Sequence, residues 1–140
     1  PNVGNGLKSF PTNENFERFA KPRLTAKSIQ EFEKAGVCPT LWKLEPQETQ
    51  AAWKKIIRAA NGIPIVVLGG GESQEQIESH LKLAARFPEI IGFAIGRTVF
   101  LEALKKLFVK KITIKKAVED ISFNFLRIVR LWELERANMK

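Results

Sequence analysis

The sequence is poor in the residues that build disulfides and metal sites. It holds one cysteine, Cys38, one histidine, His80, and no tyrosine among its 140 residues. A single cysteine excludes an internal disulfide and any cysteine-rich metal site. With only one histidine as well, we expect no metal-ligand cluster and no cofactor, and we read His80 as a structural residue. A single cysteine is compatible with a reducing compartment, and we therefore expect a cytoplasmic protein.

Long hydrophobic runs are missing too. The longest apolar stretch, residues 63–68, has the length of a strand, whereas a membrane-spanning helix needs about 20 residues. We therefore expect no membrane as partner. The hydrophobic fraction of 44% is typical of a globular protein, and 140 residues are enough for one ordinary domain.

Positive charge, in contrast, is abundant. The formal net charge is +8, and lysines are densest over residues 105–116. This excess would suit nucleic acid, an acidic surface or a phosphorylated small molecule. Glycine-aromatic and arginine-rich signatures of nucleic-acid modules do not occur. We therefore interpret residues 105–116 as solvated helix ends and do not expect nucleic acid as partner.

Apolar stretches of strand length alternate with amphipathic helical patterns along most of the chain. Residues 1–20 contain much Asn, Gly and Pro without periodicity, which predicts an irregular N-terminal arm. The domain proper is expected over 21–140. Strands are predicted over 40–45, 63–68 and 90–95, and helices over 25–35, 46–60, 73–87, 99–108 and from 113 onward.

This alternation predicts an α/β fold in which helices cover a parallel sheet. Two folds fit the pattern: a doubly wound sheet, or part of a (β/α)8 barrel. A complete barrel needs about 250 residues, so this chain could supply only part of one. In both folds, ligands bind at the carboxyl ends of the strands.

Glycines follow two of the predicted strands at that end. Gly69, Gly70 and Gly71 follow the second strand, and Gly96 and Arg97 follow the third. Glycines let a phosphate approach backbone N–H groups, and a following helix N-terminus adds partial positive charge. The alternative is that these residues only form tight turns between strand and helix. Two such turns on successive strands favour phosphate binding.

The first strand carries a lysine inside an apolar run. Lys43 and Glu45 are two residues apart and share one face, while Trp42 and Leu44 share the other. Since Trp42 and Leu44 suit contact with helices, we expect Lys43 and Glu45 to face the interior of a barrel. They could form an internal ion pair. Alternatively, Lys43 is a nucleophile that attacks a carbonyl, and Glu45 transfers protons.

Three segments resemble one family: residues 35–46 (AGVCPTLWKLEP), 66–71 (VVLGGG) and 90–108 (IIGFAIGRTVFLEALKKLF). They are similar to the aldolase-like domain fused to 5-dehydro-2-deoxygluconokinase in myo-inositol catabolism, which is related to tagatose-bisphosphate aldolases. The resemblance implies a (β/α)8 TIM barrel of which this chain carries strands six to eight. It also implies a class I lyase with Lys43 as the Schiff-base residue.

The same resemblance implies a substrate and a binding site. Phosphate would be bound by the backbone at residues 69–71 and 96–97. The implied reaction cleaves 2-deoxy-5-keto-gluconate 6-phosphate, a phosphorylated sugar, into dihydroxyacetone phosphate and malonate semialdehyde. As alternatives, the chain could be a non-catalytic sugar-phosphate binding module or a basic nucleic-acid-binding protein.

Strands one to five of the barrel have no counterpart in this chain. A partial barrel exposes two unpaired strand edges and an apolar interior face. We therefore expect a second copy of the chain, as a homo-oligomer, or a missing N-terminal half to cover them. The fragment alone could be inactive, because earlier strands supply further groups in class I aldolases.

Overall fold

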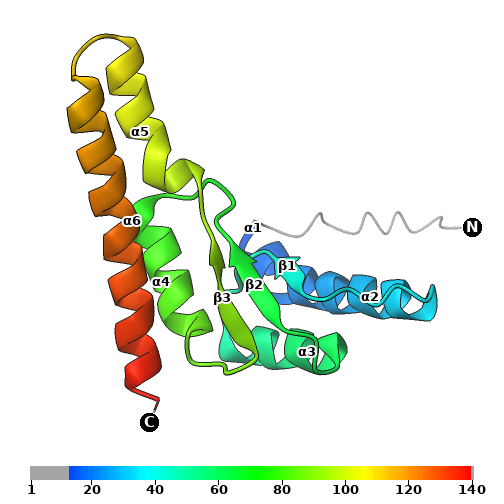
Figure 1. Ribbon diagram of the computed structural model, residues 1–140. Helices are drawn as coiled ribbons and strands as arrows, with labels where there is room; N and C mark the ends of the chain where they lie inside the picture. The colour runs from blue at the N-terminus through cyan, green and yellow to red at the C-terminus, as the bar shows by residue number, and fades with distance from the viewer. Residues whose placement is uncertain (1–12, 140) are drawn as a thin grey trace, which may run out of the picture.

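The computed structural model describes residues 13–139, which form six α-helices, a π-helix and a small sheet (Figure 1). In chain order the helices are α1 (Asn13–Asn15), the π-helix η1 (Phe16–Ala20), α2 (Lys21–Lys34), α3 (Gln50–Ala60), α4 (Gln74–Ala84), α5 (Arg97–Phe108) and α6 (Ile114–Ala137). The strands are β1 (Trp42–Leu44), β2 (Ile65–Leu68) and β3 (Ile90–Ala94). The predicted alternation of strands and helices is confirmed, and the fold is α/β.

The N-terminal helix begins earlier than the sequence pattern indicated. α1, η1 and α2 follow one another without a break, because the junction residues Asn15, Ala20 and Lys21 all have right-handed helical backbone angles. Residues 13–20 are thus helical where an irregular arm was expected. The Gly and Pro residues that suggested an arm lie before residue 13, and that part of the arm lies outside the described residues.

The sheet is parallel throughout, with the strand order β1-β2-β3. The register sets Lys43 beside Val66, and Val66 beside Gly92. Parallel strands need crossover connections, which α3 and α4 provide. The carboxyl ends of all three strands therefore meet at one edge of the sheet, as the predicted site requires.

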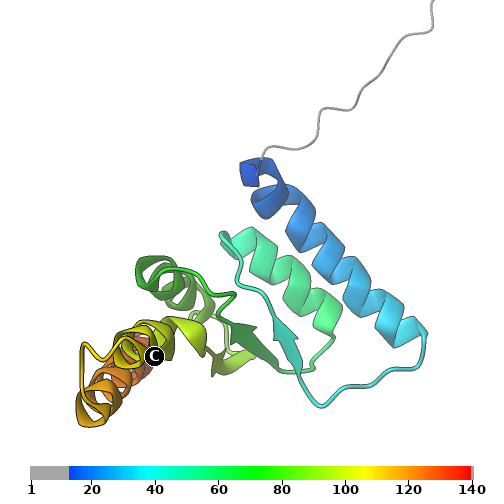
Figure 2. The same cartoon turned by 90° about the horizontal axis from the view of Figure 1, so that it is seen from above.

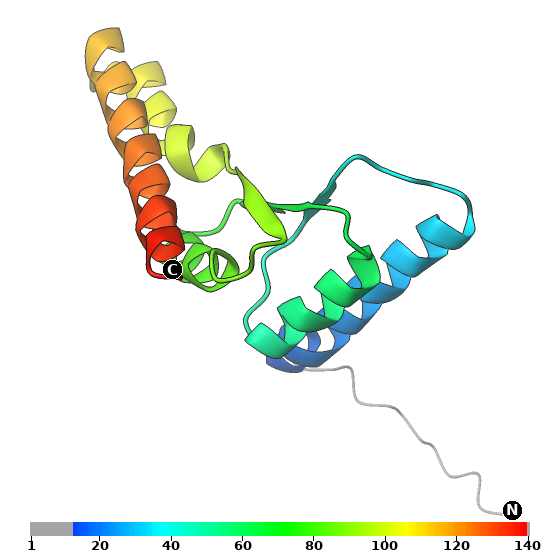
Figure 3. The same cartoon turned by 60° about the horizontal axis from the view of Figure 1, so that its bottom comes forward.

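Helices cover one face of this sheet. Figures 2 and 3 show α3 and α4 on the same side of the strands, and the core lies between them and the sheet. Trp42 and Leu44 pack against this core, as their alternation predicted. Its most deeply buried large apolar side chains are Trp53, Ile56, Ile65, Val67, Ile77, Leu81, Ile90 and Ile128.

The other face of the sheet is bare within residues 13–139. It carries Lys43, Val66, Leu68, Gly92 and Ala94, and a Cβ added to Gly92 would meet no atom within 4 Å. The outer edges of β1 and β3 have no strand partner among the described residues. The sheet is therefore open, and its bare face leaves apolar surface exposed to water.

α5 and α6 form a long hairpin that extends beyond the carboxyl ends of the strands (Figure 1, yellow and orange). The amide of Asn124 on α6 donates to the carbonyl of Val99 on α5 at 3.1 Å. Farther along α6, Arg136 donates to the backbone carbonyls of Phe87 and Ile90, before and at the start of β3. The lower half of the hairpin is thus fixed to the sheet, while its tip projects away.

None of the helices within residues 13–139 is both long and apolar enough to cross a membrane.

Candidate functional site

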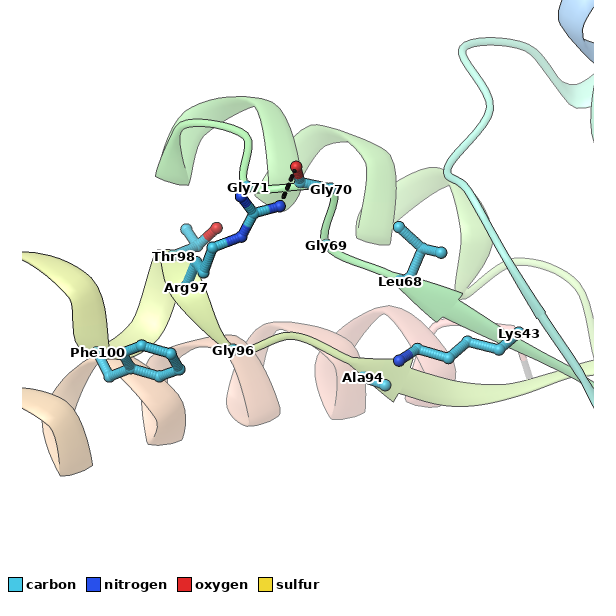
Figure 4. Close-up of a pocket in the computed structure, with 10 residues that line it drawn as sticks. All are labelled: Lys43, Leu68, Gly69, Gly70, Gly71, Ala94, Gly96, Arg97, Thr98 and Phe100. Atoms are coloured by element: carbon cyan, nitrogen blue, oxygen red, sulfur yellow. Dashed lines mark hydrogen bonds between the residues drawn. The ribbon is translucent and has the colours of Figure 1, made fainter.

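A hollow of about 310 Å³ lies at the carboxyl edge of the sheet (Figure 4). Three segments of the chain contribute to it: β1, the loop from β2 to α4, and the loop from β3 to α5. The lining residues are Lys43, Leu68, Gly69, Gly70, Gly71, Ala94, Gly96, Arg97, Thr98 and Phe100. Of the predicted site residues, all except Glu45 therefore line one hollow.

The loop after β2 is closed by its own hydrogen bonds. The N–H groups of Gly71 and Glu72 both donate to the carbonyl of Gly69, at 2.5 and 3.1 Å. Gly70 and Gly71 have φ values of +55° and +87°, which glycine adopts at little cost. Because the N–H groups of Gly71 and Glu72 are already used, the triple glycine offers a phosphate fewer donors than its sequence suggested.

Arg97 connects the two loops. Its guanidinium donates from Nη2 to the carbonyl of Gly70 at 2.8 Å, and it lies against Gly71 (Figure 4). A Cβ on Gly71 would lie 2.8 Å from Arg97 Cζ, so any larger residue would require the guanidinium to move. The hydroxyl of Thr98 adds a second link by donating to the carbonyl of Glu72 at 2.9 Å. Arg97 is thus engaged with protein atoms.

The first turn of α5 offers a phosphate more free N–H donors than the triple-glycine loop does. Its N-cap, Gly96, has no side chain that could cap the helix. The first N–H groups of a helix have no acceptor within the helix, and among residues 13–139 those of Arg97 and Thr98 have none elsewhere. In α4, by contrast, Ser73 and Gln76 form a capping box that uses two of the N–H groups at the start of this helix. Two free N–H groups and the positive end of the α5 dipole therefore border the hollow.

Lys43 reaches the same hollow from the opposite side. Its side chain extends across the bare face toward Ala94 (Figure 4). It is exposed, and within the described part of the chain it makes no ion pair or hydrogen bond. The internal pair with Glu45 that the sequence allowed does not form. Lys43 is not buried because no element within residues 13–139 covers this face of the sheet.

Glu45 is directed to another lysine. Its carboxylate lies 3.2 Å from Nζ of Lys21, which also contacts Glu17 at 2.7 Å. The Lys21 side chain is only 11% exposed. Burial by itself lowers the pKa of Lys21, but hydrogen bonds and charge interactions with Glu17 and Glu45 outweigh it and raise the pKa above 10.5. This cluster ties the start of α2 to the end of β1.

The raised pKa predicts a loss of stability in strong alkali. A pKa that is higher in the folded than in the unfolded state stabilises the protein fully below the unfolded value, and this contribution disappears as the pH rises through the folded value. Unfolding by urea at pH 9 to 11.5 should show the decline for the natural chain. The Lys21→Met variant should be less stable at pH 9 and lose less stability toward pH 11.5. Parallel declines in the two proteins would exclude Lys21 as the cause.

Comparison with known proteins assigns a family. Residues 12–136 match the family described as "Uncharacterized protein conserved in bacteria (DUF2090)". The chain belongs to this family. No curated protein matches the chain significantly. DUF2090 membership covers nearly the whole chain, including every residue of the hollow.

Four residues that line the hollow of this DUF2090 protein were not among the predicted site residues: Leu68, Ala94, Thr98 and Phe100. Phe100 lines the hollow, and its ring lies where a Cβ on Gly96 would come within 3.1 Å. Lys21, which lies outside the hollow and contacts Glu45, was not predicted because it lies 24 positions before Glu45. Thr98, whose hydroxyl links the two loops, could have been found from the sequence. Its position next to Gly96-Arg97 was the available signal.

His80 lies outside the hollow. Its Nδ1 lies 2.8 Å from a carboxylate oxygen of Glu72, and both side chains are mostly buried. This contact fixes the loop before α4 to the helix itself and agrees with a structural role. Within residues 13–139 no group of three or more His, Cys, Asp or Glu side chains could hold a metal ion.

Proposed function

We propose that the chain is the strand-six-to-eight part of a (β/α)8 barrel and binds a phosphorylated keto-sugar in the hollow at its carboxyl edge. The observation that carries this proposal is that Lys43 and the uncapped first turn of α5 border the same hollow. A primary amine and an anion-binding backbone that border one hollow suit a ligand that carries both a keto group and a phosphate.

The proposed reaction is that of a class I aldolase, a carbon-carbon lyase. The neutral amine of Lys43 attacks the keto carbon and, with loss of water, forms an iminium ion. Carbon-carbon cleavage then releases an aldehyde, and the electron pair of the broken bond is delocalised into the iminium as an enamine. Protonation and hydrolysis release the second product. The resemblance noted above suggests 2-deoxy-5-keto-gluconate 6-phosphate as substrate.

Proton transfer by Glu45 would require its carboxylate to leave Lys21, because it lies outside the hollow. In a completed barrel, the bare face of the sheet would become the interior. A second copy or an N-terminal half would then enclose Lys43, and exclusion of water would favour its neutral form.

We expect phosphate to bind at the first turn of α5 rather than at the triple glycine. In a titration of the ¹⁵N-labelled chain with inorganic phosphate, the amide signals of Arg97 and Thr98 should move most. Those of Gly71 and Glu72 should move little, because their N–H groups already donate to Gly69. The Lys43→Met variant is the control: it leaves these N–H groups in place, so the amide signals of Arg97 and Thr98 should still move most.

Two results would contradict the site. Largest shifts at Gly71 and Glu72 would assign phosphate to the other loop. No shift at any of these amides would remove the anion site. If phosphate shifts these amide signals but Lys43 forms no Schiff base, the second candidate is favoured. That candidate is a non-catalytic sugar-phosphate binding module in which Lys43 is a charge partner.

A further inference from the structure

The tip of the α5–α6 hairpin combines positive charge with exposed apolar side chains. We define the hairpin tip as residues 105–118, from the last turn of α5 through the connecting turn to the first turns of α6. It carries six lysines: Lys105, Lys106, Lys110, Lys111, Lys115 and Lys116. No acidic residue occurs between Glu102 and Glu119. The tip is therefore the most basic segment of the chain.

Large apolar side chains at the tip are exposed. Phe108 is 79% exposed, Val109 63% and Ile114 72%. Nothing within residues 13–139 shelters them, since the tip extends past the sheet (Figure 1). A partner that completed the sheet would cover the bare face and the strand edges, which lie at the other end of the hairpin. The apolar tip therefore needs a separate explanation.

The tip is an ordered element. The N–H groups of Val109, Lys110 and Lys111 donate to the carbonyls of Lys105, Leu107 and Lys106, and close the end of α5. Thr113 caps α6 by accepting from the N–H of Lys116 at 3.2 Å. The exposed side chains are thus held in place at a closed turn.

The fold does not account for all of these lysines. Lys105 and Lys106 suit the negative end of the α5 dipole. Lys115 and Lys116 lie instead in the first turn of α6, at the positive end of its dipole, where cations destabilise a helix. Asp120 compensates only Lys116, at 2.9 Å. An external anion would offset this cost.

We propose that the hairpin tip docks onto an anionic phospholipid surface. Lysines near such a surface are attracted to its headgroups, while Phe108, Val109 and Ile114 enter the boundary with the acyl chains. This contact is peripheral and needs no spanning helix, and it departs from the expectation that the chain has no membrane partner. A second copy is disfavoured at the tip because six lysines would face six lysines. Nucleic acid offers no apolar phase for the exposed aliphatic side chains.

The test is co-sedimentation of the 140-residue chain with vesicles. Binding to phosphatidylglycerol vesicles should be clear at low salt, weaken as salt rises, and be absent with phosphatidylcholine. The double variant Lys111→Glu/Lys115→Glu should bind at least about 25-fold more weakly, since each lysine contributes about fivefold. Its fold should hold, because a glutamate at position 115 suits the start of α6.

Two further variants separate the contributions. Phe108→Ala keeps every charge and should weaken vesicle binding by about tenfold, because one large apolar side chain no longer enters the bilayer. Lys27→Glu/Lys54→Glu makes the same change in net charge on exposed positions of α2 and α3 and should bind as the natural chain does.

Three outcomes would overturn the proposal. If Lys27→Glu/Lys54→Glu weakens vesicle binding as much as Lys111→Glu/Lys115→Glu does, binding depends only on net charge. Unchanged binding by Phe108→Ala would show that no apolar insertion occurs. Tighter binding to a random DNA duplex than to the anionic vesicles, lost in Lys111→Glu/Lys115→Glu, would assign the tip to nucleic acid.

Discussion

Replacing Lys43 by methionine is expected to abolish covalent trapping of dihydroxyacetone phosphate by borohydride. Reduction of the iminium ion fixes the keto phosphate to the amine as a secondary amine, which intact-protein mass spectrometry detects and peptide mapping assigns. Methionine has a similar length and no amine, so the adduct should disappear completely. The side chain is exposed on the bare face, so the fold should be unaffected.

The control is Lys54→Met on the outer side of α3, an exposed lysine outside the hollow. It should leave trapping unchanged. An adduct that persists in Lys43→Met, or that maps equally to several surface lysines, would remove the Schiff-base role. No adduct on the natural chain would likewise contradict the proposal that this chain by itself forms a Schiff base.

Substituting alanine for Gly71 is expected to destabilise the protein more than the same change at another left-handed glycine. Gly71 has a φ of +87°, where alanine is strained by about 1–2 kcal/mol. A Cβ there would also lie 2.8 Å from Arg97 Cζ, so the guanidinium must move and lose its hydrogen bond to Gly70, which is worth about 0.5–1.5 kcal/mol. Urea denaturation of the natural and variant chains measures the sum.

Gly62 provides a matched control, because its φ is +83° and a Cβ there would meet nothing within 4 Å. Gly62→Ala should show the backbone strain alone. In Gly71→Ala combined with Arg97→Ala, the extra loss should shrink, because the overlapping guanidinium is gone. Equal losses at Gly62 and Gly71 would show that the guanidinium moves aside at no cost.

Much of the fold could be predicted from local sequence patterns. The strands within 63–68 and 90–95 are continuous apolar runs, and such runs mark strands covered by helices. Ser73 with Gln76, and Thr113, cap the helices predicted to follow them. These features depend on residues three or four positions apart, so the sequence alone contains the required information.

The candidate site was less predictable because it depends on contacts between distant residues. Alternation along the strand predicted that Lys43 and Glu45 lie together, but the carboxylate of Glu45 contacts Lys21 instead. It also grouped Arg97 with phosphate, whereas the guanidinium contacts the carbonyl of Gly70. Both competing partners are set by how helix and loop pack against the strands, which no spacing rule encodes.

The length of α6 has a mechanical consequence. Its 24 residues correspond to about 36 Å of continuous helix at 1.5 Å per residue. Near one end it carries the exposed tip, near its middle Asn124 contacts α5, and near the other end Arg136 holds carbonyls at the start of β3. A movement of the tip would be transmitted along α6 and would pivot about its contact with α5. The first turn of α5 borders the hollow, so such a movement would reach the candidate site.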